Sequence, residues 1–317
     1  MVFSTPFSGV ANALALLVSF ALAAVLSRFS ARFLPSDRGR ELAFQGEKSK
    51  GKLTSAGVLF VPVFAVVTLS LYRFSTEVRL YILAILVEMA AGFLDDNARK
   101  PWGELKKGLM DLLVALFIAA VYVANNSGAV RLALWHVSVS IPPVIMFPLI
   151  VLLVWTSINV TNITDGVDGL SASQGILVLL SFLAAGVKLG ATGDMQPVFL
   201  AFVGVLLVYL WYNAPPSKHL MGDAGSRAMG VVIALAALKS GAPFLYIPLA
   251  LVFILDGGSS LMKLSARRYL KIRDFMQRVL TPLHDHVRRR MAWSDAQTVL
   301  RFLMVQVLVA AATLMLI

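Results

Sequence analysis

Four oxygen-bearing side chains interrupt an otherwise apolar part of the chain, in the segment NVTNITDGVDGL at 159–170. They recur at every third position: Asn159, Asn162, Asp165 and Asp168. A spacing of three places side chains on one side of a tight, 3₁₀-like turn, and Gly166 and Gly169 permit backbone conformations that a regular helix forbids. The pattern favours a site for a cation and phosphates, and a polar re-entrant turn is the alternative.

Two further groups of carboxylates occur elsewhere in the chain. Asp95 and Asp96 are adjacent in GFLDDNARK, and two like charges side by side repel unless a cation or a shared proton offsets them. Asp223 lies between Gly222 and Gly225 in MGDAGS, which resembles a phosphate- or metal-binding turn at a helix N-terminus. A solvated helix end and a plain N-cap are the alternatives for these two segments. Hard oxygen ligands in a chain without cysteine suit Mg²⁺ or Mn²⁺ better than zinc.

Basic residues and histidines accompany these carboxylates. The basic residues are Lys50, Arg99, Lys100, Lys107 and Arg288 to Arg290. Carboxylates for a divalent ion beside cations for phosphates are the parts that phosphoryl transfer uses, although a single lysine also serves to anchor anionic lipid headgroups. His284 and His286 flank Asp285 in PLHDH, where they suit metal ligation, proton transfer or phosphate contact. His136 and His219 carry less weight.

The composition tells which elements must position these groups. The 317 residues are 58% hydrophobic and 14% charged, whereas soluble domains carry about 25% charged residues, and the mean hydropathy is +0.80. Long apolar runs recur, and each can cross a bilayer core of about 30 Å. We therefore expect one all-α integral membrane domain over residues 1–317, whose first apolar run is a retained span and not a signal peptide. The net charge of +11 is explained by basic cytoplasmic loops, so no nucleic-acid partner is expected.

The apolar runs predict about ten transmembrane helices. They cover 8–28, 55–74, 78–94, 107–124, 141–158, 172–188, 197–213, 226–240, 243–263 and 297–317. Placing both termini outside the cytoplasm puts 23 of the 28 lysines and arginines on the cytoplasmic side, as the positive-inside rule requires. The four polar segments, 92–100, 159–170, 218–226 and 280–290, then follow alternate spans at the cytoplasmic face. This common location predicts one shared site there.

Acidic residues inside the predicted spans raise a second hypothesis. Glu88, Asp111 and Asp256 fall within or near span ends, and intramembrane acids can mark ion pathways, as in a cation-coupled transporter. Transporter sites usually lie near the bilayer midplane, between repeated halves. Here the polar segments gather at one end, and no two-half symmetry is evident. An enzyme at the cytoplasmic face is the favoured interpretation.

The polar segments also resemble a known family. GFLDDNARK, NVTNITDGVDGL, LWYNAPPSKHLMGDAGS and TPLHDHVRRR follow one another in the order and spacing of the polyprenyl-phosphate sugar-1-phosphate transferases, and the chain is most similar to the bacterial phospho-N-acetylmuramoyl-pentapeptide translocases. The resemblance extends from KSKGKLTSAG (48–57) to VLRFLM (299–304). It implies ten helices and a reaction at the cytoplasmic face of the bacterial inner membrane. In that reaction the phosphate of undecaprenyl phosphate attacks UDP-MurNAc-pentapeptide, which gives lipid I and UMP for peptidoglycan synthesis.

The resemblance assigns roles by matched position. Asp223 would ligate Mg²⁺ together with Asp165, which lies near the nucleotide. Asp95 would deprotonate or orient the lipid phosphate with Asp96 beside it, and His284 and His286 would face the sugar side of the donor. The residues expected to bind substrate are Lys50, Arg99, Lys100, Lys107, Asn159, Asn162, Asp168 and Asn213. The family also leads us to expect a homodimer.

Three departures from the family pattern stand out. The basic loop lacks the family's proline and one glycine, the segment after Asp96 has one extra residue, and the translocases' three consecutive histidines read His284-Asp285-His286 here. The last change moves the chain toward the sibling enzymes that transfer amino-sugar phosphates from UDP-HexNAc donors. Trp293 and the pair Arg301-Phe302 resemble the translocases more. The sibling activity is therefore the alternative.

Overall fold

The computed structural model describes residues 9–37, 49–100, 102–191, 193–272 and 274–317. Within these residues the secondary structure is mainly helical. Its α-helices are α1 (Gly9–Ser27), α2 (Gly57–Leu71), α3 (Thr76–Asp96), α4 (Glu104–Asn125), α5 (Pro143–Thr164), α6 (Leu170–Lys188), α7 (Gln196–Asn213), α8 (Gly222–Lys239), α9 (Tyr246–Leu249), α10 (Leu251–Arg268), α11 (Leu283–Arg290) and α12 (Asp295–Leu316). Short 3₁₀ turns lie at Ser30–Arg32, Ala133–Trp135 and Pro243–Leu245, and strands β1 (Ala129–Leu132) and β2 (Val137–Ser140) form an antiparallel hairpin.

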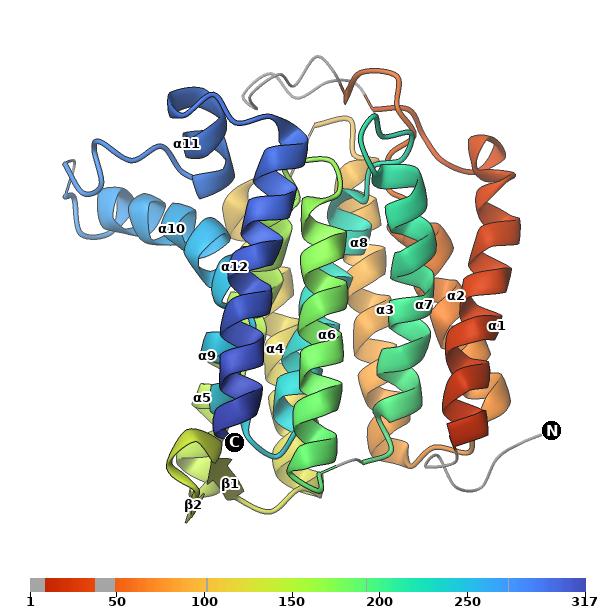
Figure 1. Ribbon diagram of the computed structural model, residues 1–317, viewed down its shortest axis with the longest axis vertical. Coiled ribbons are helices and arrows are strands. Elements are labelled where there is room, and N and C mark those ends of the chain that lie inside the picture. The colour runs from red at the N-terminus through yellow and green to blue at the C-terminus, as the bar shows by residue number, and fades with distance from the viewer. Residues whose placement is uncertain (1–8, 38–48, 101, 192, 273) are drawn as a thin grey trace.

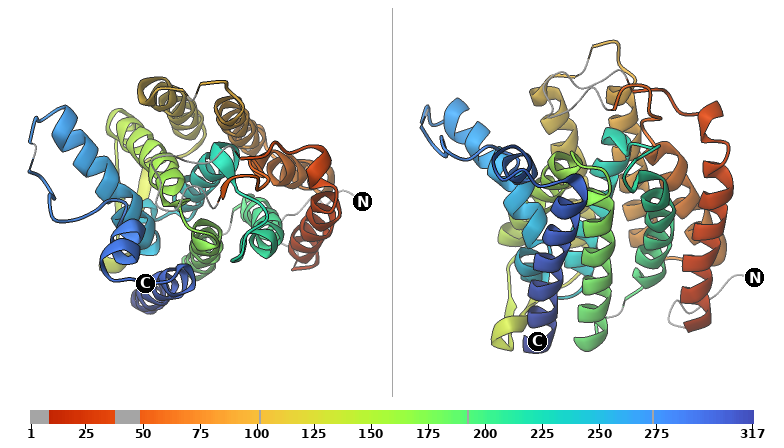
Figure 2. Two further views of the ribbon diagram at one scale, coloured as in Figure 1. Left: turned by 90° about the horizontal axis from the view of Figure 1, so that it is seen from above. Right: turned by 45° about the horizontal axis from the view of Figure 1, so that its top comes forward.

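The long helices run side by side, with α8 in the middle of the bundle (Figures 1 and 2). Helix α8 packs most extensively against α3 and α5 and also contacts α2 and α6. Every residue from Ala224 to Leu238 is buried. Small residues allow this central position: a Cβ on Gly230 would lie 2.6 Å from the Ile158 Cα atom of α5. Close backbone approach at small residues is the usual way that helices pack within a membrane.

Helices lie at all ten of the predicted spans, and six of them are long and apolar enough to cross a bilayer: α1, α4, α5, α6, α7 and α12. Helix α2 is a shorter apolar helix of 15 residues. Helices α3 and α8 fall short because charged side chains interrupt them, notably Glu88 and Arg227. These charged side chains thus reduce the apolar character of the helices that carry them.

The segment predicted as a span at 243–263 is broken into two helices. The chain bends by 86° between Pro243–Leu249 and Leu251–Arg268, so α10 leaves the bundle sideways, toward α11 (Figure 1). The break frees backbone groups that a continuous helix would pair. Gln306 of α12 takes them up: its amide donates to the Pro248 and Leu249 carbonyl oxygens at 3.1 and 3.0 Å, and its Oε1 accepts from the Val252 N–H at 3.0 Å.

The polar segments lie at one end of the bundle. The end of α3, the α5–α6 turn, the start of α8 and α11 all lie at the upper end in Figure 1. The β hairpin, the start of α1 and the end of α12 lie at the opposite end (Figure 1). The fold therefore brings the four segments to one face, as the alternation of spans predicted.

Candidate active site

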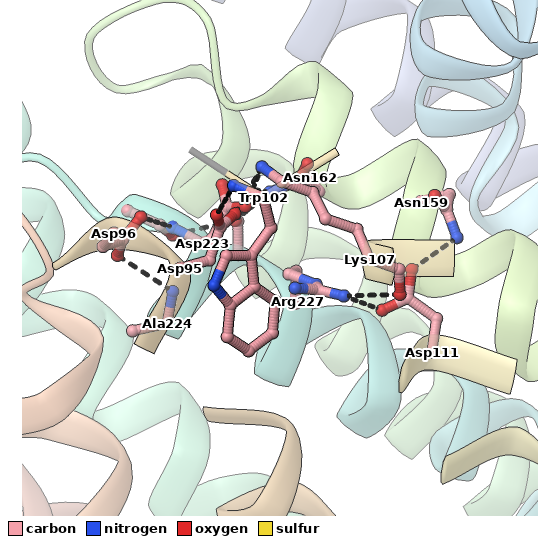
Figure 3. Close-up of polar contacts among 12 residues, drawn as sticks. Asp95, Asp96, Trp102, Lys107, Asp111, Asn159, Asn162, Asp223, Ala224 and Arg227 are labelled. Carbon is pink, nitrogen blue, oxygen red and sulfur yellow. Dashed lines mark hydrogen bonds and ion pairs between the residues drawn. The ribbon is translucent and has the colours of Figure 1, made fainter. Parts of the chain in front are cut away.

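Two aspartates and a lysine from three helices meet at the upper end of the bundle (Figure 3). The Lys107 Nζ atom of α4 lies 3.0 Å from Asp223 Oδ2 of α8 and forms a second ion pair with Asp95 Oδ2 of α3. The other oxygen of Asp95 accepts the backbone N–H of Trp102 at 2.7 Å. Asn162 on α5 donates from Nδ2 to Asp223 Oδ1 at 2.9 Å. Four helices thus place polar groups around Asp223.

The charges in this cluster favour a cation. The carboxyl groups of Asp95 and Asp223 both pair with the Lys107 Nζ atom, so they lie near each other, and two neighbouring carboxylates repel unless a proton or a cation offsets them. Lys107 supplies one positive charge. The arrangement can hold cationic groups, or phosphates bridged by a cation, beside the first turn of α8.

Asp96 turns away from this cluster and caps α8. Its carboxylate accepts the backbone N–H groups of Asp223 at 3.0 Å and Ala224 at 3.3 Å, and the Ser55 hydroxyl at 2.8 Å. The first N–H groups of a helix lack partners within the helix, and a carboxylate there also offsets the helix dipole. A Cβ on Gly222 would lie 2.3 Å from Asp96 Oδ2, so this contact requires glycine at 222. The two adjacent aspartates therefore have different tasks.

The α5–α6 turn differs in detail from its prediction. Helix α5 continues to Thr164, so Asn159 and Asn162 lie on a helix and only the residues from Asp165 onward form the turn. Asp165 accepts a hydrogen bond from the Ser171 hydroxyl of α6. Asp168 forms an ion pair with Lys52 at 3.0 Å. The turn is thereby tied both to α6 and to the basic loop.

Asn213 and His219 fix the segment that leads into α8. Asn213 accepts the Gly169 N–H at 2.7 Å and donates to the His219 carbonyl at 2.8 Å. The His219 ring lies against Tyr212, with 4.6 Å between ring centroids, and hydrogen-bonds Ser30 Oγ at 2.9 Å. Burial lowers the pKa of His219, so its ring is neutral at pH 7. The contacts of Asn213 are structural: they join the α5–α6 turn to the approach to α8.

His284 is held by an acid that lies deeper in the bundle. Asp256 of α10 accepts both the His284 backbone N–H at 2.7 Å and its ring Nδ1 at 2.8 Å. This carboxylate keeps the proton on Nδ1 and leaves Nε2 free to accept a proton. A Cβ on Gly166 would lie 2.4 Å from that Nε2 atom, so the ring borders the α5–α6 turn. His286 instead accepts the Leu280 N–H at Nδ1, at 3.2 Å.

A buried charge network lies one helical turn below Asp223 (Figure 3). Arg227 pairs with Glu88 at 3.1 Å and with Asp111, and all three side chains are at most 2% exposed. Asn159 donates to Asp111 Oδ2 at 3.1 Å. Asn159 therefore belongs to this network and not to the cluster around Asp223.

The structure thus gathers some predicted residues and separates others. Asp95, Asp223, Lys107 and Asn162 form one cluster, with Asp96 at its side. Asp165, Asp168 and His284 border the α5–α6 turn, whereas Lys50, Arg99 and Lys100 are exposed. Lys52, Arg227 and Asp256 were not assigned to the site from the sequence. Arg227 carried a usable signal, because an arginine within an apolar helix requires a buried partner.

The donor set around Asp223 fits magnesium. No group of three or more histidine, aspartate or glutamate side chains is arranged to hold a metal among the described residues. Mg²⁺ needs no such group, because it is usually bound by one or two carboxylates and completes its shell with water and substrate phosphates. Asp223 and Asp95 offer two carboxylates at close range. Asp165 shares this end of the bundle, and its pairing with Asp223 stays a prediction.

Comparison with known proteins identifies the family. The model for glycosyl transferase family 4 matches residues 78–241, which run from α3 through the end of α8 and include the cluster of Asp95, Lys107, Asn162 and Asp223. The chain belongs to glycosyl transferase family 4. It is therefore an enzyme, and the transporter hypothesis for its buried acids is not supported.

Curated relatives of this family 4 protein carry the name phospho-N-acetylmuramoyl-pentapeptide-transferase. The protein from Treponema pallidum (strain Nichols) is 40% identical over 296 residues, which cover 87% of this chain and 80% of the relative. The Clostridium botulinum (strain Eklund 17B / Type B) protein is 30% identical over 301 residues and 91% of each chain. The Borreliella burgdorferi (strain ZS7) protein is 28% identical over 293 residues, 82% of this chain and 80% of the relative. Together with the six apolar helices, these relatives show that the chain is a multi-pass membrane protein.

Proposed function

We propose that this protein is a phospho-N-acetylmuramoyl-pentapeptide transferase of peptidoglycan synthesis. It transfers phospho-MurNAc-pentapeptide from UDP-MurNAc-pentapeptide to undecaprenyl phosphate and releases UMP. The observation that carries the proposal is the meeting of Lys107 with the carboxylates of Asp95 and Asp223, in a chain 40% identical to a curated enzyme of that name. Phosphoryl transfer depends chiefly on positioning and on neutralising charge, and these side chains provide both.

The roles of the residues follow from their contacts. Lys107 would neutralise phosphate oxygens, and Asp95, fixed by Trp102, would orient the acceptor phosphate and take up its proton. His284, with its free Nε2 beside the α5–α6 turn, would meet the donor. When bound at Asp223, with Asp165 as the second predicted ligand, Mg²⁺ would offset the negative charge of the diphosphate and of the leaving UMP.

The membrane topology is part of the proposal. The protein would cross the bacterial inner membrane ten times, with α2, α3, α8 and the bent α9–α10 pair as spans beside the six apolar helices. Both termini would lie outside the cytoplasm and the site inside, where the basic loops lie. We also propose the homodimer that the family leads us to expect. Light scattering in detergent would measure the mass of the particle and so test it.

The decisive experiment is UMP release by the purified protein with undecaprenyl phosphate and Mg²⁺. UDP-MurNAc-pentapeptide and UDP-GlcNAc would be supplied in parallel reactions. We expect turnover with the first donor alone. Turnover with UDP-GlcNAc alone would make the protein a sibling amino-sugar transferase, and no turnover with either donor would refute the proposed function.

The magnesium assignment has its own test, Asp223→Asn. The substitution keeps the size of the side chain and leaves Asn162 within reach, but it removes the negative charge that a divalent cation needs. We expect turnover to fall by at least about 100-fold while the thermal unfolding midpoint stays close to that of the wild type. EDTA should abolish wild-type turnover, and added Mg²⁺ should restore it.

The matched control is Asp295→Asn, since Asp295 lies at the same end of the molecule and pairs with Arg288 at 2.9 Å. That variant should keep its turnover. Full activity of Asp223→Asn, or activity of the wild type in EDTA, would contradict the metal assignment without affecting the choice of donor.

A further inference from the structure

The buried network around Arg227 has no role in the reaction as described so far. Arg227 lies on α8, one helical turn beyond Asp223, and its side chain is 2% exposed. Its Nε atom lies 3.1 Å from Glu88 Oε1 of α3, and Nη2 forms an ion pair with Asp111 of α4. The same Nη2 donates to the Lys107 carbonyl oxygen at 3.2 Å. One guanidinium thus contacts the backbone of the lysine that binds both site carboxylates.

Such a network is an expensive way to hold helices together. Removing charges from water costs several kcal/mol for each ion, and well-packed apolar side chains in their place often leave a protein as stable or more so. The rest of α8, from Ala228 to Leu238, is buried through apolar residues and glycine alone. Stability alone therefore does not account for the arginine at 227.

The packing of α4 shows what the arginine does. The backbone of α4 packs mainly against α3 and α5, yet its first turn must place the Lys107 Nζ atom against Asp223 of α8. On the α5 side, the Trp155 ring nitrogen donates to the Gly108 carbonyl oxygen at 3.2 Å. On the α8 side, Arg227 holds the carbonyl of Lys107. Arg227 thereby fixes the first turn of α4 relative to the helix that carries Asp223.

We infer that Arg227 is a positioning residue that sets the place of Lys107 relative to Asp223 and Asp95. It touches no reacting atom and acts through the backbone of Lys107 and through Asp111. The inference rests on the proposed function, because it concerns the step in which Lys107 neutralises phosphate. It predicts that a change at Arg227 alters the rate of the chemical step more than the affinity for substrates.

The chain offers a matched control at the other end of α8. Lys239 also joins α8 to α3 and to the end of α4: its Nζ atom lies 3.0 Å from Glu77 Oε1 and donates to Asn126 Oδ1 at 2.9 Å. The two residues link the same three helices, but Lys239 lies far from Lys107, at the opposite end of the bundle. Lys239→Met therefore reports the effect of losing such a link without moving the site.

The test compares Arg227→Lys with Lys239→Met in the full-length protein. Lysine keeps a positive charge between Glu88 and Asp111, which protects the fold, but it lacks the planar fork that reaches three partners at once. We expect Arg227→Lys to lower kcat by about 10-fold to 100-fold with the KM for both substrates within about twofold. Lys239→Met should keep wild-type kcat even where its thermal unfolding midpoint falls.

A double variant tests whether Arg227 acts through Lys107. In a Lys107→Arg background, Arg227→Lys should lower the remaining kcat by less than about twofold, since residues that act as one unit are not additive. Losses that multiply, a wild-type kcat in Arg227→Lys, or equal losses of kcat in Arg227→Lys and Lys239→Met would each overturn the inference while the wild type remains active. Absence of UMP release by the wild type would instead refute the proposed function, and the inference with it.

Discussion

At the scale of single residues, carboxylates that look alike in the sequence, such as the neighbours Asp95 and Asp96, have different partners in the structure. Asp95 binds Lys107, whereas Asp96, its direct neighbour, caps α8 and approaches no basic side chain in the contacts described for it. Asp256 fixes the ring of His284 through a hydrogen bond to its Nδ1 atom. The sequence motif marks where such residues gather, and the side-chain partners decide what each one does.

The pairing of Asp256 with His284 gives a prediction at this scale. Asparagine at 256 would present an amide N–H to the ring, so the proton would move from Nδ1 to Nε2, the atom that borders the α5–α6 turn. We expect Asp256→Asn to lower kcat by at least about tenfold, with the protein still folded. Asp295→Asn, which removes an acid at the same end of the molecule, should leave kcat unchanged. Steady-state UMP release measures both, and an unaltered kcat in Asp256→Asn would refute a role of the His284 ring in the reaction.

At the scale of elements, the bend between α9 and α10 depends on one side chain of another helix. Gln306 is buried and serves three backbone groups at the break. In lipid, backbone groups freed from a helix must find partners within the protein. The bend lets α10 leave the bundle and carry the chain to α11, and the position of His284 therefore depends on α12.

The Gln306 contacts predict a loss of stability that is specific to this position. Gln306→Leu has a similar size but removes the side-chain partner of the Val252 N–H and of two carbonyl groups. We expect it to destabilise the protein by about 1–3 kcal/mol, seen as a lower thermal unfolding midpoint in detergent. Val307→Leu, at an exposed neighbouring position of α12, should have little effect. Equal midpoints for the two variants would show that the break is held by other contacts.

The sequence predicts where the helices lie, but it does not predict where a helix breaks or which loop residues pair. Apolar runs and basic loops locate helices at all ten predicted positions, because burial in a membrane demands long uninterrupted stretches. The break at residue 250 interrupts no apolar run, since residues 243–255 are apolar throughout and the first charged residue, Asp256, comes after the break. Its stabilising partner, Gln306, lies more than fifty residues away. The grouping of Asp95 with Asp223 was expected from alternate spans, whereas the ion pair between Lys52 and Asp168 depends on loop contacts that no periodicity reveals. The substrate contact expected of Lys50 stays a prediction.

At the scale of the whole molecule, the fold separates two faces. The candidate site and α11 lie at one end, and the β hairpin lies at the other (Figure 1). The proposed orientation places the site in the cytoplasm, which agrees with the positive-inside rule.

The absence of cysteine from the chain makes this orientation directly testable. Ser138→Cys places a thiol on the exposed face of the hairpin, and Met291→Cys places one just after α11, where the side chain is 56% exposed. In intact cells, a membrane-impermeant maleimide should label the thiol at 138 and not the thiol at 291. After permeabilisation both should react. The reverse pattern in intact cells would place the site outside the cytoplasm.

Because α8 lies in the middle of the bundle, the geometry of the site should persist for as long as the protein stays folded. An amide hydrogen exchanges with solvent only when its hydrogen bond opens, and a segment buried on all sides opens only when the molecule unfolds. Deuterium uptake should therefore be slowest in α8 from Ala224 onward. Asp223 stands on the first turn of that segment, so its place relative to the neighbouring helices lasts as long as the folded state itself. Substrates therefore bind and products leave beside Asp223, a carboxylate on the helix that we expect to exchange its amide hydrogens most slowly.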